Sequence, residues 1–323
     1  MVKVICLLFI LSLGCNTMGG YGLDTTTVDK HGRLSVDGKF IVDKHGEPIQ
    51  LKGMSSHGLQ WFGHYANYNT MKELRDNWGA NVFRAAMYTA EGGYLSNPSI
   101  KDKVHEIVKA AQELGIYVII DWHILHDRNP LWNKEKAKEF FAEMAQTYAD
   151  IPNVIYEIAN EPNGNDVTWW NSIKPYALEV IPVIRQHTNG IIIVGTANWS
   201  QNIQDAANDP IQEDNIVYAC HFYSATHGQW LRDRVKWVLD KNIPLFVSEW
   251  GAMPSSGNGG LNYWETQQWM NLLDRYKVGW TAWSLSNSSQ SHSVLKSWAS
   301  QHGGWDIGDL TDHGRMIRDY MLK

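Results

Sequence analysis

Short apolar runs alternate with longer stretches of mixed polarity along most of this chain. Runs of about four to eight apolar residues are typical of buried strands, whereas apolar residues spaced three and four positions apart are typical of helices with one buried face. The apolar runs predict eight strands, at 49–53, 81–87, 116–121, 154–158, 191–194, 216–220, 245–248 and 279–283. Helical spacing between them predicts helices at 100–114, 134–149, 167–187, 229–241 and 263–275, and a shorter one near 201–208.

This alternation of strands and helices occurs in two architectures, a closed barrel and an open doubly wound sheet. The eight runs and the length of 323 residues favour the barrel. No glycine-rich turn follows an early strand, which counts against an open dinucleotide-binding sheet. We therefore predict an α/β fold of the (β/α)8 TIM-barrel type.

The segment 32–53 has a different pattern from the rest of the chain. Its apolar residues alternate and are interrupted by Asp37-Gly38 and His45-Gly46, which are typical hairpin turns. We expect a small N-terminal β-hairpin element there. No repeat, low-complexity tract or linker follows residue 25, so residues 21–323 are expected to form one domain.

The first twenty residues have the pattern of a signal peptide. Lys3 precedes an apolar run over 4–13, and small or polar residues follow as far as Gly20. That run is too short to cross a bilayer, so we expect a secreted, extracellular protein with no membrane partner. Cys6 and Cys15 lie in or beside this segment, which leaves Cys220 alone in the mature domain and excludes an internal disulfide.

Charge and aromatic content narrow the possible ligands. The formal net charge of −6 argues against a nucleic-acid partner, because neutralising phosphates requires a basic face. The chain has 16 Trp and 14 Tyr, a supply of flat rings on which the apolar face of a sugar could stack. Composition alone fits a carbohydrate-binding cleft and an aromatic core equally well.

Polar and aromatic residues stand at the carboxyl end of nearly every predicted strand, the end at which TIM-barrel enzymes place their active sites. They are Arg84, Tyr88, His123, Asn160, Glu161, His221, Tyr223, Glu249 and Trp283. Glu161 and Glu249 follow the fourth and seventh strands, which face each other across a barrel. Two opposed carboxyl groups are what glycosidic bond cleavage needs, and a separation of about 5–5.5 Å would indicate retention of the anomeric configuration.

Two segments identify a family. IYEIANEP at 155–162 and VSEWG at 247–251 resemble the acid/base and nucleophile signatures of glycoside hydrolase family 5. GMSSHGLQW at 53–61, FRAAMY at 83–88 and DWH at 121–123 resemble its bacterial-type endoglucanases, subfamily 2. The resemblance runs from about residue 32 to the C-terminus. It implies a monomeric, cofactor-free endo-β-1,4-glucanase that cleaves internal bonds of cellulose or β-glucan by a retaining double displacement.

The resemblance also implies roles for the catalytic residues. Glu161 would be the acid/base and Glu249 the nucleophile, with Arg84 and Tyr223 beside Glu249. The remaining expected members of this group are His221 next to Glu161, His123 next to the sugar, and Asn160 bonded to the sugar 2-hydroxyl.

The expected substrate-binding residues are aromatic. Trp283 resembles the stacking floor of the cleavage subsite, and His57, Trp61 and Tyr88 would line the non-reducing side. Trp199 either stacks a sugar on the leaving-group side or packs in the core. Trp250 and Trp280 are expected to be core residues.

One departure from the family pattern affects substrate preference. Related glucanases tend to carry a Lys and a Glu that bond glucose hydroxyls shortly after the residue equivalent to Trp283, where this chain has Ser288 and Gln290. A β-mannanase or broad glucomannanase therefore remains an alternative to the glucanase.

Two further alternatives are weaker. A catalytically dead carbohydrate-binding protein is disfavoured because both glutamates are present. His123 and His126 resemble a metal-binding pair, but no third ligand stands at a workable spacing, so we expect no metal.

Overall fold

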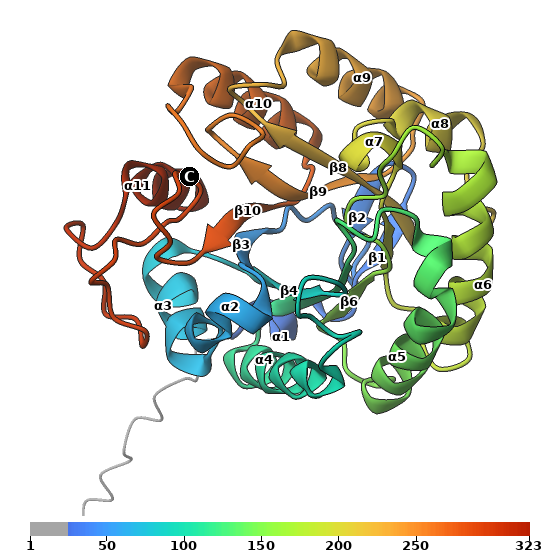
Figure 1. The fold of residues 1–323 in the computed structure, drawn as a ribbon, viewed down its shortest axis with the longest axis horizontal. Helices are drawn as coiled ribbons and strands as arrows, with labels where there is room; N and C mark the ends of the chain where they lie inside the picture. The colour runs from blue at the N-terminus through green and yellow to red at the C-terminus, as the bar shows by residue number, and fades with distance from the viewer. Residues whose placement is uncertain (1–24) are drawn as a thin grey trace, which may run out of the picture.

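The computed structural model describes residues 25–323, so the signal peptide predicted at 1–20 lies outside the described residues. Eight parallel strands close into a barrel in the order β10-β3-β4-β5-β6-β7-β8-β9, and helices surround it (Figure 1). The predicted TIM barrel is confirmed. Within residues 25–323, no helix combines the length and the apolar character needed to cross a membrane.

All eight predicted strands are present. Their bounds are β3 Lys52–Ser56, β4 Val82–Tyr88, β5 Tyr117–His123, β6 Val154–Glu157, β7 Ile192–Val194, β8 Ile216–Tyr223, β9 Leu245–Gly251 and β10 Trp280–Leu285. Most of them extend further at the carboxyl end than the apolar runs predict. Tyr88, His123 and Tyr223 are therefore the last residues of their strands, and their backbones are held by the barrel's own ladder.

The N-terminal hairpin seals the opposite end of the barrel. β1 (Ser35–Asp37) pairs antiparallel with β2 (Phe40–Val42), and Gly38 in the turn has the positive φ that such a turn requires. Leu34 and Ile41 pack with side chains inside the barrel, among them Tyr117. This apolar cluster fills the amino end of the barrel.

Helices surround the barrel, and the longer ones pack an apolar face against it (Figure 1). The helices are α1 Thr27–His31, α2 Leu59–Phe62, η1 Gly63–Tyr65, α3 Tyr68–Trp78, η2 Pro98–Ile100, α4 Lys101–Leu114, η3 Pro130–Asn133, α5 Lys134–Thr147, η4 Trp169–Ile173, α6 Lys174–Arg185, α7 Ala197–Ser200, α8 Ile203–Asn208, α9 Gln229–Asp240, α10 Tyr263–Tyr276 and α11 Asp312–Met321. In α4, Val104, Ile107, Val108 and Leu114 are fully buried, in agreement with the helical spacing.

The single helix predicted over 167–187 is divided in two. A π-helical turn, η4, precedes α6, and Pro175 stands in the first turn of α6. A proline is accommodated at that position because the first N–H groups of a helix have no partner within it. The sequence pattern continues across this junction, which explains why periodicity alone does not separate the two elements.

Six of the 16 tryptophans are fully buried in the layer between strands and helices: Trp78, Trp122, Trp169, Trp250, Trp269 and Trp280. The expectation that Trp250 and Trp280 belong to the core is confirmed. Much of the unusual tryptophan content therefore stabilises the fold.

Candidate active site

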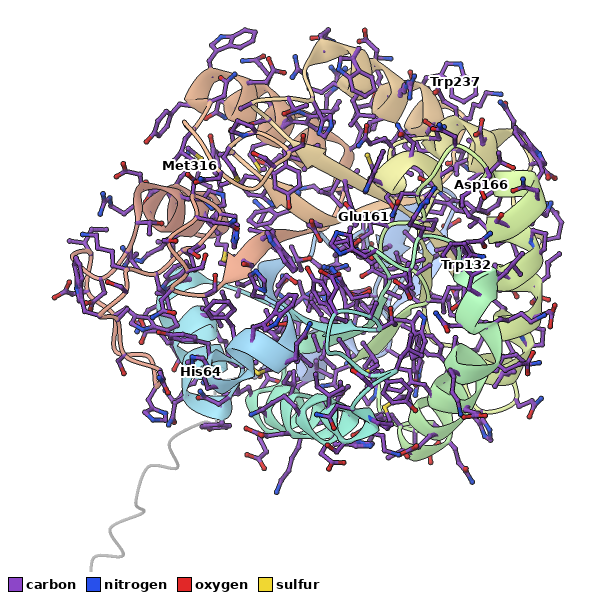
Figure 2. All side chains as sticks on the ribbon, in the orientation of Figure 1. His64, Trp132, Glu161, Asp166, Trp237 and Met316 are labelled. Atoms are coloured by element: carbon purple, nitrogen blue, oxygen red, sulfur yellow. The ribbon has the colours of Figure 1, made fainter. Side chains whose placement is uncertain are left out.

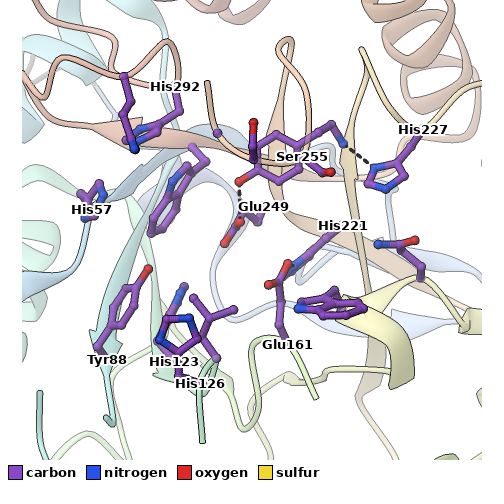
Figure 3. A pocket seen from close by; sticks show the side chains of 18 of the residues that line it. His57, Tyr88, His123, His126, Glu161, His221, His227, Glu249, Ser255 and His292 are labelled. Atoms are coloured by element: carbon purple, nitrogen blue, oxygen red, sulfur yellow. Dashed lines mark hydrogen bonds and ion pairs between the residues drawn. The ribbon is translucent and has the colours of Figure 1, made fainter. Parts of the chain in front are cut away.

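A cavity of about 850 Å³ opens at the carboxyl ends of the strands. Its wall includes the last residues of β4, β5 and β8, namely Tyr88, His123 and Tyr223, together with Glu249 and Trp283. Figure 2 shows Glu161 near the middle of the ring of strands, and Figure 3 shows the cavity from close by. The strand ends thus deliver most of the predicted polar residues to one mouth, while Arg84 and Asn160 are fully buried and do not line it.

The two glutamates lie close together at the floor of this cavity. Oxygens of Glu161 and Glu249 and a ring nitrogen of His221 all lie within 4.8 Å of one another. Retaining glycosidases have carboxyl groups about 5–5.5 Å apart, whereas inverting ones need about 6.5–9.5 Å to admit a water. The separation seen here fits direct attack by one carboxylate on the anomeric carbon.

Glu249 is surrounded by hydrogen-bond donors. The Tyr223 hydroxyl donates to its Oε1 at 2.7 Å, and Nη1 of Arg84 lies 3.4 Å from its Oε2. Burial raises the pKa of Glu249, and the neighbouring Glu161 raises it further, while Arg84 is among the groups that oppose this shift. The two donors favour the carboxylate over the acid, which is the form a nucleophile requires.

Glu161 has a different environment. Its Oε1 lies 2.9 Å from Nδ1 of His221, and no guanidinium among residues 25–323 is hydrogen-bonded or ion-paired with it. Burial, the largest cause, raises the pKa of Glu161 to about 8, and lowers the pKa of His221 to about 4. At neutral pH a protonated Glu161 therefore faces a neutral imidazole, and two like carboxyl groups divide into an acid and a base through their surroundings.

Arg84 is the central cation beneath the site. It is fully buried, with Nε 2.7 Å from Glu157, Nη2 2.9 Å from Asp121 and Nη1 near Glu249. One guanidinium thus faces three carboxyl groups. Burial raises the pKa of Asp121 to about 7, and Arg84 partly opposes this.

His123 and Asn160 form a layer above Arg84. His123 Nδ1 lies 2.6 Å from Asp121, and the Asn160 amide donates to His123 Nε2 at 3.2 Å. The Asn160 oxygen accepts from Arg84 at 2.7 Å. Asn160 is fully buried and its polar atoms are bonded to protein, so its contact with a sugar 2-hydroxyl stays a prediction that requires one of these bonds to be shared.

Aromatic rings line one side of the cavity. The His57 and Trp283 ring centroids lie 5.0 Å apart, those of Tyr88 and His123 4.1 Å apart, and those of His123 and Trp283 5.4 Å apart. Trp61 packs edge-on against Tyr88 and is 45% exposed at the rim. His57, Tyr88 and Trp283 line the cavity and Trp61 packs beside them, while their placement on the non-reducing side stays a prediction.

Trp199 is on the cavity wall as well. Its side chain is 44% exposed, and its backbone N–H donates to the Pro162 carbonyl, two residues before Gly164. Of the two readings, stacking and core packing, this exposure favours stacking. This backbone bond joins the loop after β7 to the loop after β6, which carries Glu161.

Several residues of the site escape the sequence reasoning. His292 is buried beside the cavity, with Nε2 2.8 Å from Oε1 of Gln290 and Nδ1 3.1 Å from the Ser284 hydroxyl. His227 accepts the backbone N–H of Tyr223 on its Nδ1 at 2.8 Å. The four-residue spacing from Tyr223 to His227, directly after a strand, is the signal that could have indicated His227.

The two residues that depart from the family pattern, both in the loop after Trp283, have different positions relative to the cavity. Gln290 lines the cavity. The Ser288 hydroxyl lies 2.7 Å from that of Ser293 and accepts from the Gln290 backbone, and Ser288 is not part of the wall. Of the pair, Gln290 is the one placed to contact a sugar.

Possible cation ligands are engaged with protein. His123 pairs with Asp121, whereas the 74% exposed His126 pairs with Glu91 at 2.9 Å. The trio Glu161, His221 and Glu249 is compact enough for a cation, but both nitrogens of His221 are already in hydrogen bonds. We interpret the trio as acid–base machinery.

A (β/α)8 barrel with two carboxyl groups at this spacing in an aromatic-walled cavity defines a glycoside hydrolase fold and site. The model of the family "Cellulase (glycosyl hydrolase family 5)" matches residues 42–289. The chain belongs to this family, as the motifs predicted.

Its relatives are endoglucanases. Endoglucanase N of Pectobacterium atrosepticum is 52% identical over 92% of this chain and 67% of its own length. Endoglucanase A of Evansella cellulosilytica is 54% identical over 85% of this chain and 56% of its own length. The chain thus spans between about half and two thirds of the length of these relatives.

Solved structures agree. The catalytic domain of Thermobifida fusca endoglucanase Cel5A has a TM-score of 0.89 and 39% identity, covering 92% of this chain and all of that domain. A variant of that domain in complex with cellotetraose has a TM-score of 0.88 and 38% identity, with the same coverage.

Proposed function

We propose that this domain is a retaining endo-β-1,4-glucanase, with Glu161 as acid/base and Glu249 as nucleophile. The observation that carries the proposal is the pair of carboxyl groups within 4.8 Å, one surrounded by donors and the other facing a neutral histidine. The exposed rings of Trp61 and Trp199 at the cavity margin suit a chain that extends past the site in both directions. The cellotetraose complex of the structural neighbour supports a β-glucan substrate.

In the first step, an oxygen of Glu249 forms a bond to the anomeric carbon while the glycosidic C–O bond breaks. Glu161 delivers its proton to the departing oxygen, so the leaving chain departs as a neutral alcohol. Tyr223 and Arg84 hold the attacking carboxylate in place. The product is a glycosyl ester of Glu249.

In the second step, Glu161 is a carboxylate and accepts a proton from water. The water oxygen bonds to the anomeric carbon, and the ester bond to Glu249 breaks. Both displacements invert the carbon, so the configuration is retained. The site returns to a protonated Glu161 and an ionised Glu249.

Incubation with carboxymethyl cellulose, mannan, xylan and lichenan tests the proposal through the reducing ends released. We expect the highest rates on carboxymethyl cellulose and lichenan. A mannan rate above both would instead support the mannanase alternative, which Gln290 in the wall keeps open.

The pH profile of kcat/KM should be bell-shaped. Activity requires ionised Glu249, so it falls at acid pH, and it requires protonated Glu161, so it falls as pH rises through the pKa of about 8. We expect a maximum at roughly pH 5–7 with an alkaline limb above it. Initial rates on cellotetraose from pH 4 to 10 measure this, and a rate that still rises at pH 9 would rule out Glu161 as the proton donor.

The loop after Trp283 should control substrate affinity. Ser288→Lys together with Gln290→Glu introduces the charged groups typical of relatives, and each charge-assisted hydrogen bond contributes about 1.5–3 kcal/mol, partly offset by lost water. We expect a severalfold lower KM for cellopentaose, a smaller change in kcat and a higher glucan-to-mannan ratio. Because Gln290 lines the cavity, Gln290→Glu alone should give most of the effect. If neither KM nor the ratio changes, the loop does not contact the sugar.

We further propose that residues 21–323 form a single secreted, monomeric catalytic domain. Cys220 is the one cysteine within residues 25–323 and is buried, with its pKa raised to about 12, so it is not available for a disulfide to a partner. N-terminal sequencing of protein from the culture medium tests secretion, and light scattering tests the monomer.

A further inference from the structure

A row of hydrogen bonds leads from Glu161 into the barrel floor. Oε1 of Glu161 lies 2.9 Å from Nδ1 of His221, and Nε2 of His221 lies 2.9 Å from the Ser248 hydroxyl. That hydroxyl donates to Oε1 of Glu157 at 2.6 Å. The four residues come from β6 and the loop after it, β8 and β9, and all are buried.

The donor and acceptor of each hydrogen bond in this row follow from the state of Glu157, the residue farthest from the cavity. Oε2 of Glu157 accepts a charged hydrogen bond from Nε of Arg84 at 2.7 Å. Burial raises the pKa of Glu157 and Arg84 opposes this shift; because the bond is a short ion pair with a fully buried guanidinium, we assign Glu157 as the carboxylate. A carboxylate can only accept, so the single proton of the Ser248 hydroxyl is directed at Glu157. The Ser248 oxygen then presents a lone pair to His221, and Nε2 of His221 must carry a proton to bond it.

The remaining ring nitrogen decides the state of Glu161. A neutral imidazole has one N–H, and with that proton on Nε2 its Nδ1 is only an acceptor. The 2.9 Å contact with Oε1 of Glu161 is then a hydrogen bond only if Glu161 supplies the proton. We propose that Ser248 and Glu157 are positioning residues that fix the tautomer of His221 and thereby hold Glu161 in its protonated, proton-donating form; this rests on the function proposed above.

The row has a consequence for the second displacement. Once Glu161 has given its proton to the leaving oxygen, its carboxylate faces the lone pair of Nδ1 of His221. That arrangement is repulsive, so it favours the return of a proton to Glu161 from the attacking water. The same tautomer therefore serves proton donation and proton recovery.

Replacing Ser248 changes none of the other side chains around Glu161 and His221, although Glu157 loses the hydrogen bond from the Ser248 hydroxyl in variants without it. The charged groups that act on Glu161 and His221 are Arg84, Asp121, Glu157 and Glu249. The neutral ones are Tyr88, His123, Tyr223 and His227. A change in Glu161 on substitution of Ser248 alone therefore reports the hydroxyl.

Ser248→Thr and Ser248→Val form a matched pair, because the two new side chains have the same shape and only threonine has the hydroxyl. With valine, His221 is free to move its proton to Nδ1 and donate it to an ionised Glu161. We expect the alkaline limb of kcat/KM on cellotetraose to stay in place in Ser248→Thr and to move by about one unit to lower pH in Ser248→Val. Ser248→Ala, which adds no volume, covers the case in which the larger side chains do not fold, and should also move the limb down.

A second substrate separates this role from a structural one. The leaving group of 2,4-dinitrophenyl β-cellobioside needs little protonation. With this substrate, the pH profile of kcat/KM above neutrality should therefore be the same for the Thr and Val variants. A merely structural role would lower the melting temperature and the rate on both substrates without moving the limb. Equal limbs for Thr and Val on cellotetraose would overturn the proposal.

The tautomer itself can be observed by 15N NMR of histidine-labelled protein, with the His221 signals assigned from their loss in His221→Gln. We expect the proton on Nε2 in the wild type and in Ser248→Thr, and on Nδ1 in Ser248→Val. If His221 of the wild type carries its proton on Nδ1, the proposal is overturned. This readout does not need turnover, so a wild type inactive on cellotetraose would count against the proposed function alone.

Discussion

Glu249→Gln is expected to lower kcat on carboxymethyl cellulose by roughly 10⁴-fold or more, because an amide cannot form the glycosyl ester. Glutamine has nearly the same shape: its single oxygen can accept from Arg84, and its amide N–H can donate to the Tyr223 hydroxyl. Arg84 keeps its ion pairs with two other carboxyl groups. Burial raises the pKa of Glu249. The folded protein is therefore destabilised by the charge of Glu249 at any pH above its unfolded-state pKa. The melting temperature at pH 7 should therefore equal or exceed that of the wild type.

The covalent intermediate gives this prediction a direct measurement. A 2-fluoro cellobioside with an activated leaving group should add one fluorocellobiosyl unit to the wild type, as seen by mass spectrometry, and peptide mapping should place it on Glu249. Glu249→Gln should gain no mass. An adduct on another residue, or near-normal turnover by the variant, would contradict the assignment of the nucleophile.

The barrel could be predicted from the sequence because of where its strands lie. Strands of a parallel barrel are covered on both faces, so they appear as continuous apolar runs, and helices between them keep a separate periodicity. Every residue of β4, β5, β8 and β9 is buried. The division of 167–187 into η4 and α6 could not be predicted, since a π-turn changes hydrogen bonding without interrupting the apolar pattern.

The mouth of the site was equally accessible to prediction, because strand ends converge in a barrel. In the layer beneath it, Arg84 was predicted, but its partners were not. Asp121 and Ser248 lie inside strands and Glu157 ends one, and each looks like an isolated polar residue in or beside an apolar run. Their function depends on contacts across the barrel, such as Ser248 to Glu157 over 91 positions, and no spacing rule predicts such pairs.

Arg84 shows why this layer has to be complete. A buried ion pair that loses one partner costs about 3–5 kcal/mol, since the remaining charge is left without compensation. Arg84 faces Asp121, Glu157 and Glu249 together, so its removal would affect the fold and the nucleophile at once. For that reason, variants of the two glutamates are sharper probes of catalysis than variants of the arginine.

Glu161→Gln should lower kcat/KM on cellotetraose by roughly 10²–10⁴-fold, the range that a general acid contributes. The loss should be much smaller in the first step with 2,4-dinitrophenyl β-cellobioside, whose leaving group departs without a proton. Hydrolysis of the intermediate still needs a base, so this substrate should show a burst of dinitrophenol followed by slow turnover. Azide, a nucleophile that needs no deprotonation, should restore the slow phase and yield a β-cellobiosyl azide with retained configuration.

Stability supplies the control for this variant. The pKa of Glu161 is about 8 in the folded protein against an ordinary value of 4.5, so folding favours the protonated form, and stability is lost as pH rises from about 4.5 through about 8. Glutamine removes this loss, and its amide can donate to Nδ1 of His221 as the acid does. The melting temperature of Glu161→Gln should therefore match the wild type at pH 4 and exceed it at pH 8. Equal loss of rate on both substrates, or a lower melting temperature at pH 8, would mean that Glu161 is not the buried acid of this site.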